Sequence, residues 1–140
     1  MQERFVGRSG LSVSRVGLGT ASWGRDTDEH EAADILRTYL DAGGTLIDTA
    51  ASYGAGASEA VVGQLLAEHR RDDVVVVSKA GSGVPHGRPG TSRGAMLASL
   101  DQSLARLGTD HLDLWLVQGW DPRVPVDESL GALEYAVSTG

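Results

Sequence analysis

Two patterns of apolar residues alternate along this chain. Short apolar runs, typical of strands, are followed by stretches in which apolar residues recur every three or four positions, which is typical of helices. The clearest run is Val74–Val77, whose consecutive β-branched residues indicate a strand buried on both faces of a parallel sheet. The clearest helical stretch runs from about Glu29 to Ala42, and Gly43 and Gly44 end it.

The predicted elements follow one repeating order. A hairpin is expected over residues 2–14, around the polar turn at 7–10, and four strand–helix units follow it. The strands are expected at 15–20, 45–48, 74–77 and 112–118, and the helices at 29–42, from 59 onward with Ser58 as N-cap, at 93–107 and at 127–138. Repeated units of this kind imply parallel strands and right-handed crossovers. Either an open doubly wound sheet or part of a closed barrel satisfies that order, and residues 1–140 are expected to form one domain.

Composition narrows the class of protein. The chain has 140 residues, of which 41% are hydrophobic and 22% charged, as in an ordinary globular domain. The formal charge of −7 argues against binding nucleic acid or an anionic membrane by charge alone. There is no cysteine, which excludes disulfides and thiolate metal sites. Residues 1–8 contain no apolar signal core, and no apolar run approaches the ~20 residues of a membrane span, so a cytoplasmic protein is expected.

Several polar residues stand where the predicted strands end. Ligands of parallel α/β sheets gather at the carboxyl ends of the strands, so these positions are the candidate site. They are Gly19, Thr20, Asp48, Tyr53, Ser78, Lys79 and Gln118. Taken singly, the aspartate is more often a cap, the lysine a solvated charge and the tyrosine a packing residue. Together, an acid, a phenol and an amine at one rim indicate chemistry.

The trio of Asp48, Tyr53 and Lys79 suits proton transfer to an oxygen. A free phenol is a poor proton donor near neutral pH because its pKa is ~10, and a nearby ammonium favours the phenolate. A carboxylate holds that ammonium charged and in place. Such a phenol can protonate a developing alkoxide, or deprotonate an alcohol in the reverse direction. This arrangement suits hydride transfer to a carbonyl, where negative charge develops on oxygen.

A set of motifs carries a resemblance to a known family. The motifs are Arg4–Leu11 with Val13-Ser14, Gly17-Leu18-Gly19-Thr20, Trp23-Gly24, Asp41-Ala42-Gly43, Ile47-Asp48-Thr49-Ala50, Tyr53-Gly54, Ser58-Glu59 and Lys79. With them the chain resembles the aldo-keto reductases almost from end to end. The resemblance implies an α/β fold, the parallel (β/α) barrel of TIM type, of which this chain would be the first four βα units with an N-terminal hairpin cap. It also implies NADP(H), or less often NADH, as the cofactor, and no metal.

The resemblance also implies roles for individual residues. Tyr53 would be the general acid, Lys79 the neighbour that favours its phenolate, and Asp48 the partner of Lys79. The expected cofactor contacts are Gly19, Thr20 and Asp48, and the residues expected to line an apolar substrate pocket are Trp23 and Trp120.

The chain departs from the family pattern at the fourth catalytic position. The family has a histidine there, often within Val-His-x-Trp-Asp, whereas this chain reads Val-Gln-Gly-Trp-Asp over residues 117–121. Gln118 can donate a hydrogen bond to a substrate oxygen but cannot relay a proton. Loss of a well-placed donor in such a site costs ~10²–10³ in rate, part of which Gln118 can retain. Of the histidines, only His86 is expected at the same rim.

The second departure is length. A complete barrel of this type needs ~250 residues, and this chain stops after the fourth unit. The later strands and the loops that hold the nicotinamide amide and the adenosine phosphate in the family are therefore missing. We expect a homo-oligomer, or a partner chain that supplies the missing half of the barrel.

The alternatives differ in fold and in function. The doubly wound fold predicts G-x-G-x-x-G; Gly17 and Gly19 match, but Ser22 stands at the third glycine and a polar loop delays the helix. The favoured function is a carbonyl or alcohol oxidoreductase acting on a small molecule. The others are a non-redox degenerate barrel serving as a binding or regulatory subunit, and an acid–base lyase or isomerase that reuses Asp48, Tyr53 and Lys79.

Overall fold

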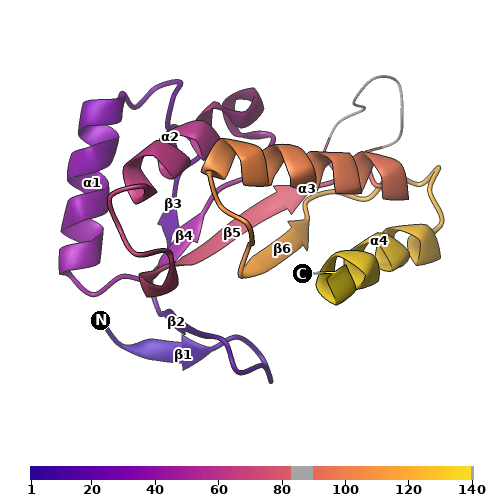
Figure 1. Cartoon of the computed structure of the whole chain (residues 1–140), viewed down its shortest axis with the longest axis horizontal. Coiled ribbons are helices and arrows are strands. Elements are labelled where there is room, and N and C mark those ends of the chain that lie inside the picture. Colours follow the sequence, from indigo (N-terminus) through magenta and orange to yellow (C-terminus); the bar gives the residue numbers. More distant parts are fainter. Residues whose placement is uncertain (83–89, 140) are drawn as a thin grey trace.

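The computed structural model describes residues 1–82 and 90–139. Its elements alternate along the chain as the hydrophobic pattern predicts (Figure 1). The strands are β1 (Glu3–Phe5), β2 (Ser12–Ser14), β3 (Leu18–Gly19), β4 (Leu46–Asp48), β5 (Val75–Ala80) and β6 (Leu114–Val117). The α-helices are α1 (Glu29–Asp41), α2 (Ala57–Leu66), α3 (Arg93–Leu107) and α4 (Val126–Thr139), and 3₁₀ turns lie at Tyr53–Gly56 and Arg71–Asp73.

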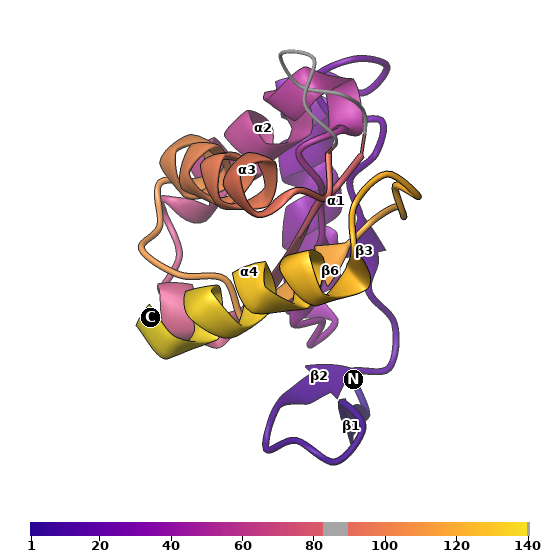
Figure 2. The same cartoon turned by 90° about the vertical axis from the view of Figure 1, so that its right-hand side faces the viewer.

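The strand order decides between the two architectures. Strands β1 and β2 form the antiparallel hairpin, and the described residues contain one further sheet, whose order is β3-β4-β5-β6 with every pair parallel. The helices contact one another in chain order, α1 to α2, α2 to α3 and α3 to α4 (Figures 1 and 2). A doubly wound sheet reverses its strand order, whereas a barrel keeps it. The structure therefore confirms the partial barrel and excludes the doubly wound alternative.

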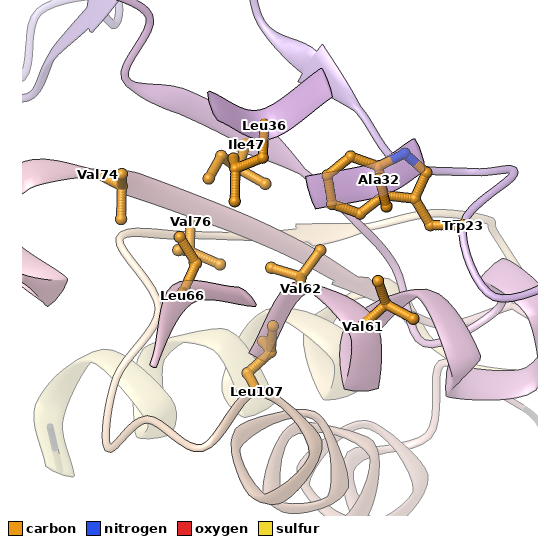
Figure 3. Packing of buried hydrophobic residues seen from close by; sticks show 10 residues of the cluster. All are labelled: Trp23, Ala32, Leu36, Ile47, Val61, Val62, Leu66, Val74, Val76 and Leu107. Atoms are coloured by element: carbon orange, nitrogen blue, oxygen red, sulfur yellow. The ribbon is translucent and has the colours of Figure 1, made fainter. Parts of the chain in front are cut away.

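The main core lies between the helices and one face of the sheet (Figure 3). Its buried residues are Trp23, Ala32, Leu36, Ile47, Val61, Val62, Leu66, Val74, Val76 and Leu107. Because side chains alternate along a strand, Ile47 and Val76 face the helices while their neighbours in sequence face the opposite side of the sheet. Strand β5 is buried on both faces up to its lysine, as its β-branched run predicts.

Helix α2 begins earlier than the sequence predicts. Its first residue is Ala57 and its N-cap is Gly56, so the prediction that Ser58 caps this helix is wrong. Gly56 has a φ of 94°, a conformation that favours glycine. A Cβ there would also lie 2.5 Å from Nε of Arg106, so the guanidinium packs where any other residue would put its side chain. Ser58 is instead fully buried in the first turn.

Candidate active site

Strand register brings the acid and the amine of the predicted site to the same face. Gly19 pairs with Asp48, and Asp48 pairs with Val77, two residues before Lys79. Since alternate residues share a face, Gly19, Asp48 and Lys79 all lie on the side of the sheet away from the helical core. In a barrel this is the inner side, at the carboxyl ends of the strands.

The Lys79 ammonium lies between the carboxylate and the phenol. Its Nζ is 2.8 Å from the Asp48 carboxylate, 3.0 Å from the carbonyl oxygen of Thr49 and 3.1 Å from the Tyr53 hydroxyl. It also lies 4.7 Å from the centre of the Tyr53 ring. The Lys79 side chain is only 14% exposed, and its contacts use all three N–H donors. The structure thus assembles the predicted trio from residues as many as 31 positions apart.

The loop that carries Tyr53 is bent by a run of left-handed residues. The Tyr53 N–H donates to the carbonyl of Ala50, and then Gly54, Ala55 and Gly56 have φ values of 58°, 55° and 94°. Ala55 is the one described residue other than glycine with positive φ, a conformation that costs energy and that the surrounding structure must hold. This turn folds the chain back into α2 and leaves the Tyr53 hydroxyl against Lys79.

A buried cluster of hydroxyl groups lies beneath this rim. The Ser58 hydroxyl is 2.7 Å from that of Thr20 and 2.9 Å from that of Thr49, and all three residues are fully buried. The Thr20 hydroxyl also donates to the carbonyl of Asp48 at 3.0 Å. The cluster ties the ends of β3 and β4 to α2. The Thr20 side chain is therefore engaged inside the protein.

A buried carboxylate supports the same strand from the opposite side. Glu59 is 0% exposed, and its oxygens accept from the Ser78 hydroxyl at 2.6 Å and from Arg106 at 2.8 Å. Because Lys79 faces away from the helices, the adjacent Ser78 must face them, and it meets Glu59 there. In the sequence, Glu59 is predicted only as the start of a helix and as part of the Ser58-Glu59 motif. A charged residue among the apolar positions of a helix was the available signal.

Gln118 reaches the loop that carries the tyrosine. Its backbone N–H donates to the carbonyl of Ala80 at 2.7 Å, directly after β6 ends. Its Oε1 accepts a hydrogen bond of 2.8 Å from the hydroxyl of Ser52, the residue before Tyr53. The structure therefore places all four predicted catalytic residues around the ends of β4, β5 and β6.

The two tryptophans have different environments. Trp120 is 74% exposed in the loop after β6, where it can line a pocket at the rim. Trp23 is only 2% exposed and belongs to the core cluster, where it lies beside Ala32 (Figure 3). Its large apolar ring is stabilised by burial against α1 and α2.

The loop after β6 also carries an ion pair. The guanidinium of Arg123 donates to both oxygens of Asp121 and lowers the pKa of that carboxyl to about 2.

Within residues 1–82 and 90–139 no group of three or more His, Asp or Glu could hold a metal ion. His86 lies outside the described residues. No described helix is long and apolar enough to cross a membrane.

Comparison with known proteins agrees with this geometry. Residues 15–140 match the sequence profile described as "Aldo/keto reductase family". The chain belongs to the aldo-keto reductase family. It is 39% identical to "Uncharacterized oxidoreductase YrpG" of Bacillus subtilis over 100% of this chain and 47% of that protein. It is 37% identical to "L-glyceraldehyde 3-phosphate reductase" of Escherichia coli, again over 100% of this chain and 43% of that protein.

A solved aldo-keto reductase gives the same fold. The holo form of AKR11C1 from Bacillus halodurans superposes with a TM-score of 0.88 at 35% identity, over 100% of this chain and 47% of that one. The chain therefore spans about half the length of the relatives that it matches, and its sheet is a partial TIM barrel.

Proposed function

We propose that this aldo-keto reductase chain carries the proton-transfer half of an NADP(H)- or NADH-dependent carbonyl reductase or alcohol dehydrogenase acting on a small molecule. The observation that carries the proposal is the position of the Lys79 ammonium, 2.8 Å from the Asp48 carboxylate and 3.1 Å from the Tyr53 hydroxyl. Membership of a family whose relatives include named oxidoreductases supports it.

The proposed roles follow from charge and reach. The Tyr53 hydroxyl gives its proton to the substrate oxygen as the carbonyl is reduced, and takes it back in the oxidative direction. Lys79 stabilises the phenolate that this transfer leaves. Asp48 keeps Lys79 charged and aimed, since a carboxylate beside an ammonium favours the charged form of both. Gln118 contributes a neutral hydrogen bond to the same oxygen.

The face beside these residues fits a nicotinamide ring. Apart from its two chain neighbours, no described residue has a heavy atom within 4 Å of the position that a Cβ on Gly19 would occupy, which leaves room for a flat ring at the strand end. Gly19 pairs with Asp48, so we assign the near wall of the cofactor site to these two residues. A reduced nicotinamide would supply the hydride for the carbonyl carbon. Thr20 is left out of this wall because its side chain is buried.

We further propose that additional strands pair with the two edges of this sheet and close it. Among the described residues β3 and β6 each pair on one side only. Leu116 and Val117 of β6 are 36% and 39% exposed. Unpaired strand edges of this kind favour pairing with further backbone.

The test combines cofactor binding with turnover. NADPH fluorescence should change on titration with the purified chain, alone or in the assembly that light scattering detects. NADPH oxidation with a panel of aldehydes and ketones should fall ~10²–10⁴-fold in Tyr53→Phe. Tyr135→Phe is the matched control, because Tyr135 is on α4 and 47% exposed, and its rate should be unchanged.

Three results would count against the proposal. Full activity in Tyr53→Phe would show that the phenol does not transfer the proton. Cofactor binding without turnover would favour a binding or regulatory subunit. Turnover of a substrate without any nicotinamide, abolished by Tyr53→Phe, would favour an acid–base lyase or isomerase.

A further inference from the structure

We infer that Ser52 is a positioning residue for Gln118, holding the side-chain amide so that its Nε2 presents a neutral hydrogen-bond donor to the substrate oxygen. The inference deepens the proposed function and rests on it. Its starting point is the 2.8 Å hydrogen bond from the Ser52 hydroxyl to Oε1 of Gln118, across 66 positions of sequence.

The backbones of both residues are fixed on opposite sides of the same strand end. The N–H of Ala51, just before Ser52, donates to the carbonyl of Lys79. The N–H of Gln118 donates to the carbonyl of Ala80. The serine–glutamine hydrogen bond therefore bridges the loop after β4 and the loop after β6 over the end of β5. A bond between two anchored backbones costs less side-chain entropy than one between mobile loops.

The direction of the bond decides what the amide offers to a ligand. A primary amide has one acceptor oxygen and two N–H donors. Oε1 is engaged by Ser52, and among residues 1–82 and 90–139 the Nε2 group has no hydrogen-bond acceptor. The flipped amide would turn oxygen lone pairs toward a carbonyl oxygen, which repels. Ser52 thus selects the orientation that can stabilise negative charge on the substrate oxygen.

An amide in place of an imidazole at position 118 changes how the rate depends on pH. An imidazole changes its charge between pH ~5 and ~8, whereas an amide carries no titratable proton there. The described titratable groups of this corner include Lys79, Asp48 and Tyr53, and the Lys79 ammonium contacts both of the others. The contribution of Gln118 to the rate should therefore be the same across that pH range.

A double-mutant cycle tests the positioning role. Ser52→Ala should lower kcat ~3- to 10-fold with little change in the affinity for NADPH, and Ser52→Thr, which keeps the hydroxyl, should restore most of it. In a Gln118→Ala background, Ser52→Ala should have no further effect, since the serine acts only through the amide. Ser138→Ala, at an exposed serine on α4, is the control and should leave kcat unchanged. Equal losses from Ser52→Ala in both backgrounds would overturn the inference.

A second measurement does not depend on activity. The side-chain amide of Gln118 should give two well-separated, ordered NMR signals in the wild-type chain, and Ser52→Ala should make that group mobile. An amide equally ordered in both proteins would overturn the inference. If no variant oxidises NADPH, the proposed function fails, while these signals still decide whether Ser52 positions Gln118.

Discussion

The ion pair of Glu59 and Arg106, on the helix-facing side of β5, gives the largest difference in expected stability between two single variants. Glu59 is 0% exposed, and its two hydrogen-bond donors are the neutral hydroxyl of Ser78 and the guanidinium of Arg106. Arg106→Met leaves this carboxylate buried without a cation, and we expect the free energy of unfolding to fall by ~3–5 kcal/mol. Glu59→Gln keeps a side chain that can still accept from Ser78. It leaves behind a guanidinium that is 30% exposed to water, so the expected loss is only ~1–3 kcal/mol.

The double variant separates charge from packing. In Glu59→Gln with Arg106→Met no ion remains unpaired, so the combined loss should be smaller than the sum of the single losses by ~0.5–3 kcal/mol. The assay is urea denaturation followed by circular dichroism, with comparison of midpoints and slopes. The surface pair of Arg37 and Asp34, whose side chains are 67% and 74% exposed, is the control, and Arg37→Met should cost ~0–1 kcal/mol.

Either of two results would refute this reasoning. A loss from Arg106→Met no larger than that from Glu59→Gln would mean that the carboxylate is not held as a buried charge. Strict additivity would mean that Glu59 and Arg106 are not coupled. Because Ser78 precedes Lys79 on β5, the expected destabilisation should also reduce any measured turnover.

Other predictions concern packing and charge. Gly63→Ala would place a Cβ 2.5 Å from the carbonyl oxygen of Arg106, so it should force α2 and α3 apart and cost ~1–3 kcal/mol in thermal or urea unfolding. Trp23→Ala should lower the free energy of unfolding by ~3–5 kcal/mol in the same assay, because the side chain lies in the core. A change near zero would show that the Trp23 side chain does not stabilise the core. Arg123 holds the pKa of Asp121 at about 2, below its unfolded value of ~3.9, so the stability that this pair adds is present above pH ~4 and is lost as pH falls toward 2. Arg123→Ala should raise the Asp121 midpoint in a carboxyl NMR titration, and an unchanged midpoint would contradict the assignment.

Local sequence pattern was enough for the order of elements and for part of the site. Hydrophobic period distinguishes strands from helices, and a repeating strand–helix order places the ends of successive parallel strands along one rim. Asp48, Tyr53 and Lys79 were predictable as neighbours for that reason, and the register of β4 with β5 then gives Asp48 and Lys79 a common face.

Only the tertiary structure decided which polar and aromatic side chains stay accessible. Trp23, Thr20 and Ser58 all belong to the family motifs, yet the packing of the helices on the sheet buries all three. The contacts from Glu59 to Arg106 and from Ser52 to Gln118 span 47 and 66 positions. A periodic pattern fixes how side chains alternate within one element, but not which partner from a distant element meets them. That choice depends on how the helices are placed over the sheet, and it sets the surroundings of Asp48, Tyr53 and Lys79.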